Sequence, residues 1–286
     1  MGEKTGRLSC VMIAAVMFCQ SAWTMDLKLN DKLALVTGST AGIGYACARG
    51  LLKEGAQVIV NGRTQEGVDA ALAQLKKETG RTALGFAGDM STPAAANKLF
   101  AAHPNVDILV NNVGAFQAKP FEETTDEDWN GIFELNVMSG VRLARLYLPG
   151  MKARNWGRVI FISSESGLQI PVESIHYGMT KSAQIAVARG LAELMAGTNV
   201  TVNSVLPGPT RTRAASTFIE RAVAQGQSAE ALEKKFFEER RPTSLIKRFA
   251  DPDEVASLVV YVASPLSSAT TGAALRVDGG VVKSAF

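Results

Sequence analysis

The sequence contains little histidine and little cysteine. Its 286 residues include two histidines, His103 and His176, and three cysteines, Cys10, Cys19 and Cys47, which have no paired spacing. Zinc sites are built mainly from these two residue types in closely spaced pairs, so an ordinary zinc site is excluded. We therefore expect reduced thiols and no bound metal.

The sequence also lacks an excess of either charge. Its 30 basic and 27 acidic side chains leave a formal net charge of +3, and they are spread evenly along the chain. A nucleic-acid groove requires a concentrated basic surface, so we expect no nucleic-acid partner. Internal repeats and low-complexity segments are absent as well.

The apolar run near the N-terminus is too short to span a bilayer comfortably. Residues 11–18 follow Lys4 and Arg7 and precede small and polar residues, a pattern that resembles a signal peptide. The alternative is a start codon assigned too far upstream, because residues 25–29 make a natural beginning just ahead of the first expected strand. We favour this alternative, treat residues 1–24 as an extension, and expect a cytoplasmic protein without membrane contact. Export is the other interpretation, if the extension acts as a signal.

Short apolar runs alternate with longer stretches of helical periodicity. Such alternation predicts an α/β fold in which helices cover both faces of a doubly wound parallel sheet of the Rossmann type. We expect one domain over residues 25–286. The expected strands include residues 33–36, 58–60, 108–110, 159–162 and 200–205.

A glycine-rich turn follows the first expected strand. In the run from Thr37 to Gly44, glycines occupy positions 38, 42 and 44. Gly38 permits a tight turn, Gly42 lets a phosphate approach the backbone, and Gly44 allows helix and strand to pack closely. We predict a dinucleotide pyrophosphate here, with Gly38, Thr40, Ile43 and Gly44 in contact with it.

The end of the second expected strand carries an arginine and no acid. A NAD-preferring site places a carboxylate here to accept from the ribose hydroxyls, whereas an arginine pairs with a 2′-phosphate. Because Asn61, Gly62 and Arg63 stand at this point, we predict NADP with Arg63 on its phosphate. The alternatives are a solvated Arg63 and an Asn61 that closes the turn rather than assisting the phosphate.

Two further loops follow expected strands at the edge where ligands bind in such folds. Asp89 and Met90 come after the third strand, and Asn112 and Gly114 after the fourth. Asp89 is positioned to accept from the adenine amino group, and the 112–114 backbone to lie against the adenosine ribose. Ordinary turn chemistry explains either loop taken singly.

A tyrosine, a lysine and a serine carry the expected chemistry. Reducing a ketone requires a proton for the carbonyl oxygen, and Tyr177 is the expected donor. Lys181 lies one helical turn later on the same face, where its ammonium lowers the pKa of the phenol. Ser164, thirteen residues before Tyr177, follows the fifth expected strand and can hold the substrate oxygen. Its neighbour Ser163 points the other way in an extended segment.

These residues together resemble the short-chain dehydrogenase/reductase family in its common single-domain form. The resemblance covers about residues 29–282. Departures are Val113 where alanine is commoner, Gly62 where NAD-dependent members carry aspartate, and the extension before Met25. The matching positions, all in family order, are residues 37–44, 111–114, Asn136, Ser164, Tyr177, Lys181, Pro207 and Gly208.

The resemblance implies further roles. It selects Ser164 over Ser163, places Lys181 on the nicotinamide ribose, and makes Asn136 the residue that disrupts a helix and holds a water of a proton relay. Pro207, Gly208 and Thr212 are expected to contact the nicotinamide carboxamide. A homotetramer or homodimer is also implied.

Residues 212–242 resemble the family's substrate lid. They include Phe218, Ile219, Phe236 and Phe237, and a charge run at residues 233–241 that we interpret as a solvated helix face. Glu165 either meets a polar or cationic substrate group or is a surface carboxylate. His176 does not share a helix face with its neighbour Tyr177, so we do not expect it to be catalytic.

The resulting hypothesis is an NADP(H)-dependent oxidoreductase of small-molecule ketones or secondary alcohols. A 3-oxoacyl-carrier-protein reductase shares every catalytic residue and is the alternative enzyme. A non-catalytic NADP-binding sensor or scaffold is the alternative of another class, although it has no need of a phenol beside an ammonium.

Overall fold

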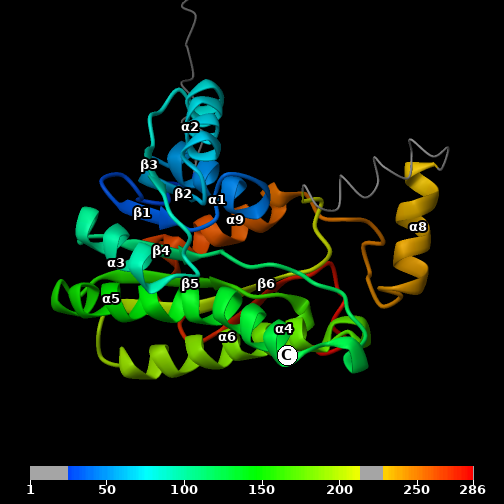
Figure 1. The fold of residues 1–286 in the computed structure, drawn as a ribbon. Coiled ribbons are helices and arrows are strands. Elements are labelled where there is room, and N and C mark those ends of the chain that lie inside the picture. The colour runs from blue at the N-terminus through cyan, green and yellow to red at the C-terminus, as the bar shows by residue number, and fades with distance from the viewer. Residues whose placement is uncertain (1–24, 213–227, 286) are drawn as a thin grey trace, which may run out of the picture.

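The computed structural model describes residues 25–212 and 228–285 (Figure 1). The N-terminal extension, and with it Cys10 and Cys19, lies outside the described residues. So do residues 213–227 of the expected lid, including Phe218 and Ile219.

The fold is built on a seven-stranded parallel sheet in the order β3-β2-β1-β4-β5-β6-β7. This confirms the predicted single α/β domain with a Rossmann-type sheet. The strands are β1 (Leu33–Val36), β2 (Gln57–Gly62), β3 (Leu84–Ala87), β4 (Ile108–Asn111), β5 (Gly157–Ile162), β6 (Val200–Pro207) and β7 (Ala274–Val277).

Helices cover both faces of the sheet (Figure 1). On one face lie α1 (Gly42–Lys53), α2 (Gln65–Thr79) and α9 (Pro252–Ala263), and on the other lie α3 (Pro93–Ala102), α5 (Ser139–Ala153) and α6 (Ile175–Leu194). α4 (Asp126–Phe133) packs beside α6, and α8 (Ala229–Glu239) forms an arm at the side of the molecule. Among the described helices, none is both long and apolar enough to cross a membrane. Short 3-10 turns occupy Phe121–Glu123, Glu165–Gly167, Val172–Ser174 and Pro265–Ser267.

Strand residues divide alternately between two hydrophobic cores. Ile160 and Ile162 of β5 pack under α1 and α9, whereas Val159 and Phe161 pack under α5 and α6. This follows from the period of two along a strand, and burial on both faces explains why these strands are apolar throughout. The carboxyl ends of β1, β4, β5 and β6 consequently meet at one edge, where the candidate site residues lie.

The turn between β1 and α1 depends on its glycines as the sequence predicts. Gly38 and Gly42 have φ angles of +60° and +58°, which favour glycine. A Cβ on Gly44 would lie 2.6 Å from the Gly38 carbonyl oxygen and closer still to the Asn112 side chain. α1 therefore begins in close contact with the turn and with the end of β4.

This contact predicts the effect of one methyl group. Gly44→Ala should lower the free energy of unfolding by about 1–3 kcal/mol, because the atoms it meets include backbone that cannot yield easily. Urea denaturation measures the change. The control is Gly190→Ala on the exposed side of α6, where a Cβ meets nothing within 4 Å and should add about 0.5–1 kcal/mol. Equal effects of the two substitutions would contradict the packing argument.

Candidate active site

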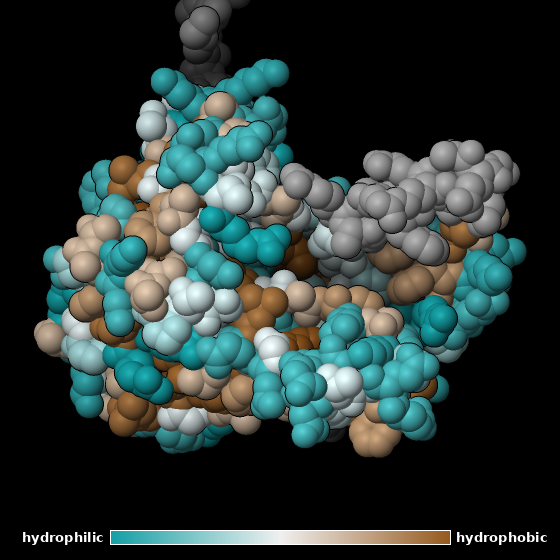
Figure 2. Space-filling view, viewed as in Figure 1, coloured by the Kyte–Doolittle hydropathy of each residue, from teal (hydrophilic) through white to brown (hydrophobic). Residues whose placement is uncertain are grey.

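A cleft of about 1040 Å³ lies at the carboxyl edge of the sheet, between the body and α8. Figure 2 shows the surface hollowed between the body and this arm. Most of the residues singled out from the sequence line it. They are Gly38, Ile43, Gly44, Asn112, Gly114, Ser164, Tyr177, Lys181, Pro207, Gly208 and Thr212.

The remaining candidates lie around this cleft. Thr40 lines an adjoining depression of about 580 Å³ next to α2. Arg63 and Asp89 are exposed near the ends of β2 and β3. Met90 is 1% exposed and packs in the core. Asn136 is buried behind the cleft wall.

Two asparagine side chains hold the glycine turn. Asn112 Nδ2 donates to the carbonyl oxygens of Thr37 at 2.9 Å and Gly38 at 3.1 Å. Asn61 accepts from the Gly38 amide at 3.2 Å and donates to the carbonyl oxygens of Phe86 and Gly88. Asn61 therefore closes the turn, and its side chain is already engaged on both sides.

Side chains of neighbouring residues pack closely against Gly62. A Cβ on Gly62 would lie 2.5 Å from Cγ2 of Thr40 and 3.1 Å from Cγ2 of Val68. An aspartate here would displace Thr40, because 2.5 Å is far below a van der Waals contact. Arg63 is the next residue and is exposed, so this end of β2 presents an arginine and no carboxylate.

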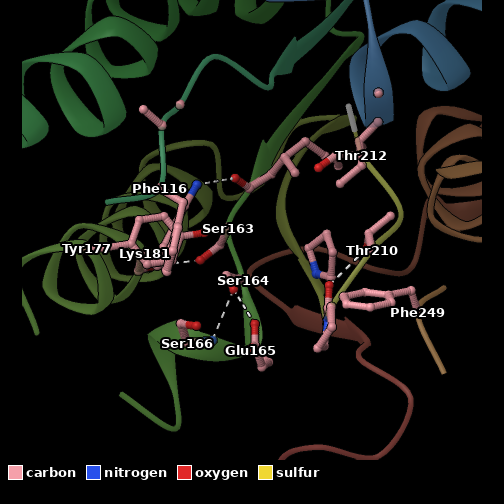
Figure 3. A pocket seen from close by; sticks show the side chains of 18 of the residues that line it. Phe116, Ser163, Ser164, Glu165, Ser166, Tyr177, Lys181, Thr210, Thr212 and Phe249 are labelled. Atoms are coloured by element: carbon pink, nitrogen blue, oxygen red, sulfur yellow. Dashed lines mark hydrogen bonds between the residues drawn. The ribbon is translucent and has the colours of Figure 1, made fainter. Parts of the chain in front are cut away.

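The serine, tyrosine and lysine come together at the floor of the cleft (Figure 3). Tyr177 and Lys181 lie one turn apart on α6, with Lys181 Nζ 5.6 Å from the centre of the Tyr177 ring. The Ser163 hydroxyl donates to the Lys181 carbonyl oxygen at 2.8 Å and so anchors α6. Ser164 instead accepts from the Ser166 amide and donates to Glu165.

Asn136 lies in a π-helical turn, Glu134–Met138, between α4 and α5. Its side chain bonds both the amide and the carbonyl of Ala115 and donates to Thr180 Oγ1 at 3.0 Å. Its backbone carbonyl accepts from Gln184 Nε2 at 2.6 Å. π-helical turns of this kind are frequent at functional sites.

Gln184 connects Asn136 to the lysine, and the sequence analysis missed it. Gln184 Oε1 accepts from Lys181 Nζ at 3.0 Å, and the Ile162 carbonyl accepts from the same nitrogen at 2.9 Å. The available signal was a glutamine three residues after Lys181, on the same helix face and within an otherwise apolar stretch.

Burial sets the protonation of the reacting groups. Burial raises the pKa of the Tyr177 phenol and the Glu165 carboxylate raises it further, while Ser164 and Arg241 lower it. Burial also lowers the pKa of Lys181 from 10.5 to about 7, against the opposing effect of Glu165. We expected Lys181 to be the cation that eases ionisation of the phenol. With protein groups alone, desolvation opposes charge on both residues, and the cation that lowers the pKa of Tyr177 is Arg241.

Glu165 is buried and connects Ser164 to Arg241, which follows α8. Its carboxylate accepts from the Ser164 hydroxyl and, at 3.0 Å, from Arg241 Nε. The interpretation of Glu165 as a surface carboxylate is therefore wrong, because its exposure is 4%. Arg241 was also expected on a solvated helix face, but its side chain is largely buried. Lys234 and Lys235 do lie on such a face, where they form exposed ion pairs with Glu238 and Glu239.

The arm is also held by aromatic packing. Phe236 and Phe237 of α8 pack against Phe249, with ring centres 4.9 and 5.2 Å away. His176 faces Gln117 and Trp129 and does not line the cleft, in accord with its expected non-catalytic position.

Comparisons with known proteins agree with this fold. A family model described as short chain dehydrogenase matches residues 32–222. Two uncharacterized oxidoreductases of Bacillus subtilis (strain 168), YvaG and YvrD, are 47% and 49% identical to the chain over 264 residues, covering 92% and 91% of it and all of each relative. The L-sorbose reductase of Gluconobacter frateurii, solved with NADPH and L-sorbose, is 34% identical with a TM-score of 0.84, covering 91% of this chain and all of that one. The chain therefore belongs to the short-chain dehydrogenase/reductase family of oxidoreductases.

The buried amine of Lys181 predicts a pH dependence of stability. Its pKa is about 7 in the folded chain and 10.5 ordinarily, so between these values the unfolded chain binds a proton that the folded chain does not. Stability therefore rises with pH across this window. Lys181→Met lacks this contribution, so its free energy of unfolding minus that of the parent should fall from pH 7 to pH 10, by at most about 1.4 kcal/mol per pH unit. Urea denaturation at several pH values measures it, and a constant difference would refute the shift.

Proposed function

We propose that this oxidoreductase transfers hydride between NADP(H) and a ketone or secondary alcohol. The observation that carries the proposal is the convergence of the Ser164 hydroxyl, the Tyr177 phenol and the Lys181 amine on a single cleft that continues to the glycine turn. The cleft residues fit a dinucleotide, because Gly38 and Gly42 bare the backbone at the start of α1.

Each residue then has a defined task. The bound nicotinamide supplies the hydride in reduction and accepts it in oxidation. Ser164 holds the substrate oxygen, and Tyr177 donates the proton that this oxygen needs as negative charge develops. Lys181 is fixed by Ile162 and Gln184 beside the phenol. Tyr177 is protonated before the reaction, as a phenol is at neutral pH, and so has the proton that reduction requires.

Three observations support NADP over NAD. Position 62 carries no carboxylate of the kind that a NAD site uses and could gain a side chain only by displacing Thr40, and Arg63 is exposed beside it. The structurally similar L-sorbose reductase was solved with NADPH. We assign Arg63 to the 2′-phosphate, Asp89 and the Met90 backbone to adenine, and Thr212 with Pro207 and Gly208 to the carboxamide.

The alternative substrate class is an acyl-carrier thioester. The 3-oxoacyl-[acyl-carrier-protein] reductase FabG of Aquifex aeolicus (strain VF5) is 34% identical to the chain, over 90% of it and all of the relative. Comparing turnover of a 3-oxoacyl carrier with that of free ketones distinguishes the two. The homotetramer or homodimer, like the cytoplasmic location, stays a prediction.

Removing the Tyr177 hydroxyl tests the proposed acid/base. Tyr177→Phe should reduce kcat by about 10²- to 10⁴-fold, the usual contribution of a positioned general acid. NADPH affinity, followed by the fluorescence of the bound cofactor, should stay within a few-fold of the parent. A variant that keeps its turnover would remove Tyr177 from the chemistry.

Removing the Arg63 guanidinium tests the phosphate assignment. Arg63→Ala should weaken NADPH binding by about 1.5–3 kcal/mol, as for a lost hydrogen bond to a charged group, and leave NADH nearly unchanged. Titration calorimetry with both cofactors measures this. The control is Arg81→Ala, which should affect neither cofactor, because Arg81 is exposed and precedes the amino end of β3, away from the carboxyl ends of the strands. An equal loss for NADPH and NADH in the Arg63 variant would count against the assignment.

A further inference from the structure

A buried carboxylate lies directly beside the reacting serine. Glu165 begins the 3-10 turn Glu165–Gly167 after β5, and its carboxylate accepts a hydrogen bond from the Ser164 hydroxyl (Figure 3). It is 4% exposed and lines the cleft together with Tyr177. The proposed reaction gives this acid no task, and a buried charge is costly to retain unless it is paired.

The cation that pairs with Glu165 is shared with a second carboxylate. Arg241 donates from Nε to Glu165 at 3.0 Å and from Nη1 to Glu173 at 3.3 Å, so one guanidinium serves two carboxylates. Its side chain is 12% exposed, which makes the pair with Glu165 largely buried. A substrate anion next to Ser164 would face the Glu165 carboxylate at close range. Lys181 and Arg240, the other cations among the described residues that line the cleft, make no hydrogen bond to Ser164.

The serine cannot serve both partners. A hydroxyl has one proton to donate, and in the proposed reaction Ser164 directs it to the substrate oxygen. Glu165 Oε2 then loses its donor while still buried. A substrate that carries its own donor next to the carbonyl would restore the hydrogen bond, whereas an apolar group there would leave the oxygen unpaired.

We propose that the substrates of this site are neutral α-hydroxy ketones, whose hydroxyl on the carbon beside the carbonyl donates to Glu165 Oε2. This proposal rests on the proposed function and names its substrate class. Glu165 is then a specificity residue that contacts the substrate, and Arg241 is a positioning residue that holds its carboxylate.

An isosteric pair of substrates tests the proposal. 1-Hydroxy-2-propanone and 2-butanone have the same number of non-hydrogen atoms and differ in a hydroxyl against a methyl. With NADPH and the full chain, kcat/KM for the hydroxy ketone should exceed that for 2-butanone by more than about tenfold, since a site built to bond a hydroxyl rejects the analogue that lacks it. Acetoacetate, an anionic ketone, should be the poorest of the three.

Two matched variants identify the residue responsible. Glu165→Gln and Glu173→Gln each remove one carboxylate partner of Arg241, but only Glu165 contacts Ser164. The hydroxy-ketone preference should fall at least several-fold in Glu165→Gln and persist in Glu173→Gln, with NADPH affinity unchanged in both. The substrate panel on the parent decides the question even if Glu165→Gln does not fold.

The outcomes separate this proposal from the function on which it rests. Equal turnover of 2-butanone, a preference for acetoacetate, or a preference unaffected by Glu165→Gln would overturn the assignment to α-hydroxy ketones while leaving ketone reduction intact. Failure to turn over any carbonyl compound with either nicotinamide would overturn the proposed function and this proposal with it.

Discussion

Removal of water from polar groups at one edge of the sheet governs this site. Lys181, Tyr177 and Glu165 are all nearly inaccessible to solvent or strongly affected by burial, and each depends on neighbouring polar atoms to remain there. Desolvation raises the pKa of the Tyr177 phenol and lowers that of the Lys181 amine to about 7. The same desolvation makes any unpaired oxygen on Glu165 costly, so protonation and substrate choice have a common physical origin.

Local sequence patterns predicted the parts of the molecule that local physics determines. Short apolar runs located the buried strands, and the spacing of the glycines located the turn before α1, where Gly38 and Gly42 have positive φ angles. Helical spacing brought Tyr177 and Lys181 to one face. Each of these inferences involves residues close together in the chain, where backbone geometry alone decides the neighbours.

The missed features are contacts between distant segments. Glu165 and Arg241 are separated by 76 positions, so the burial of both could not be foreseen from charges that look solvated in the sequence. Gln184 donates to the Asn136 carbonyl across 48 positions, at a π-helical turn. The lowered pKa of Lys181 could likewise not be foreseen, because desolvation depends on the whole surrounding fold.

The ion pair between Glu165 and Arg241 also helps to hold the segment that follows α8 beside the cleft. Arg241 comes directly after α8, which is itself fastened by the Arg211–Glu233 ion pair and by its phenylalanines. The segment after α8 is thereby connected by an ion pair to the carboxylate that accepts a hydrogen bond from Ser164. A substitution that removes the Glu165 carboxylate would therefore also remove one of the contacts that hold the segment after α8 beside the cleft.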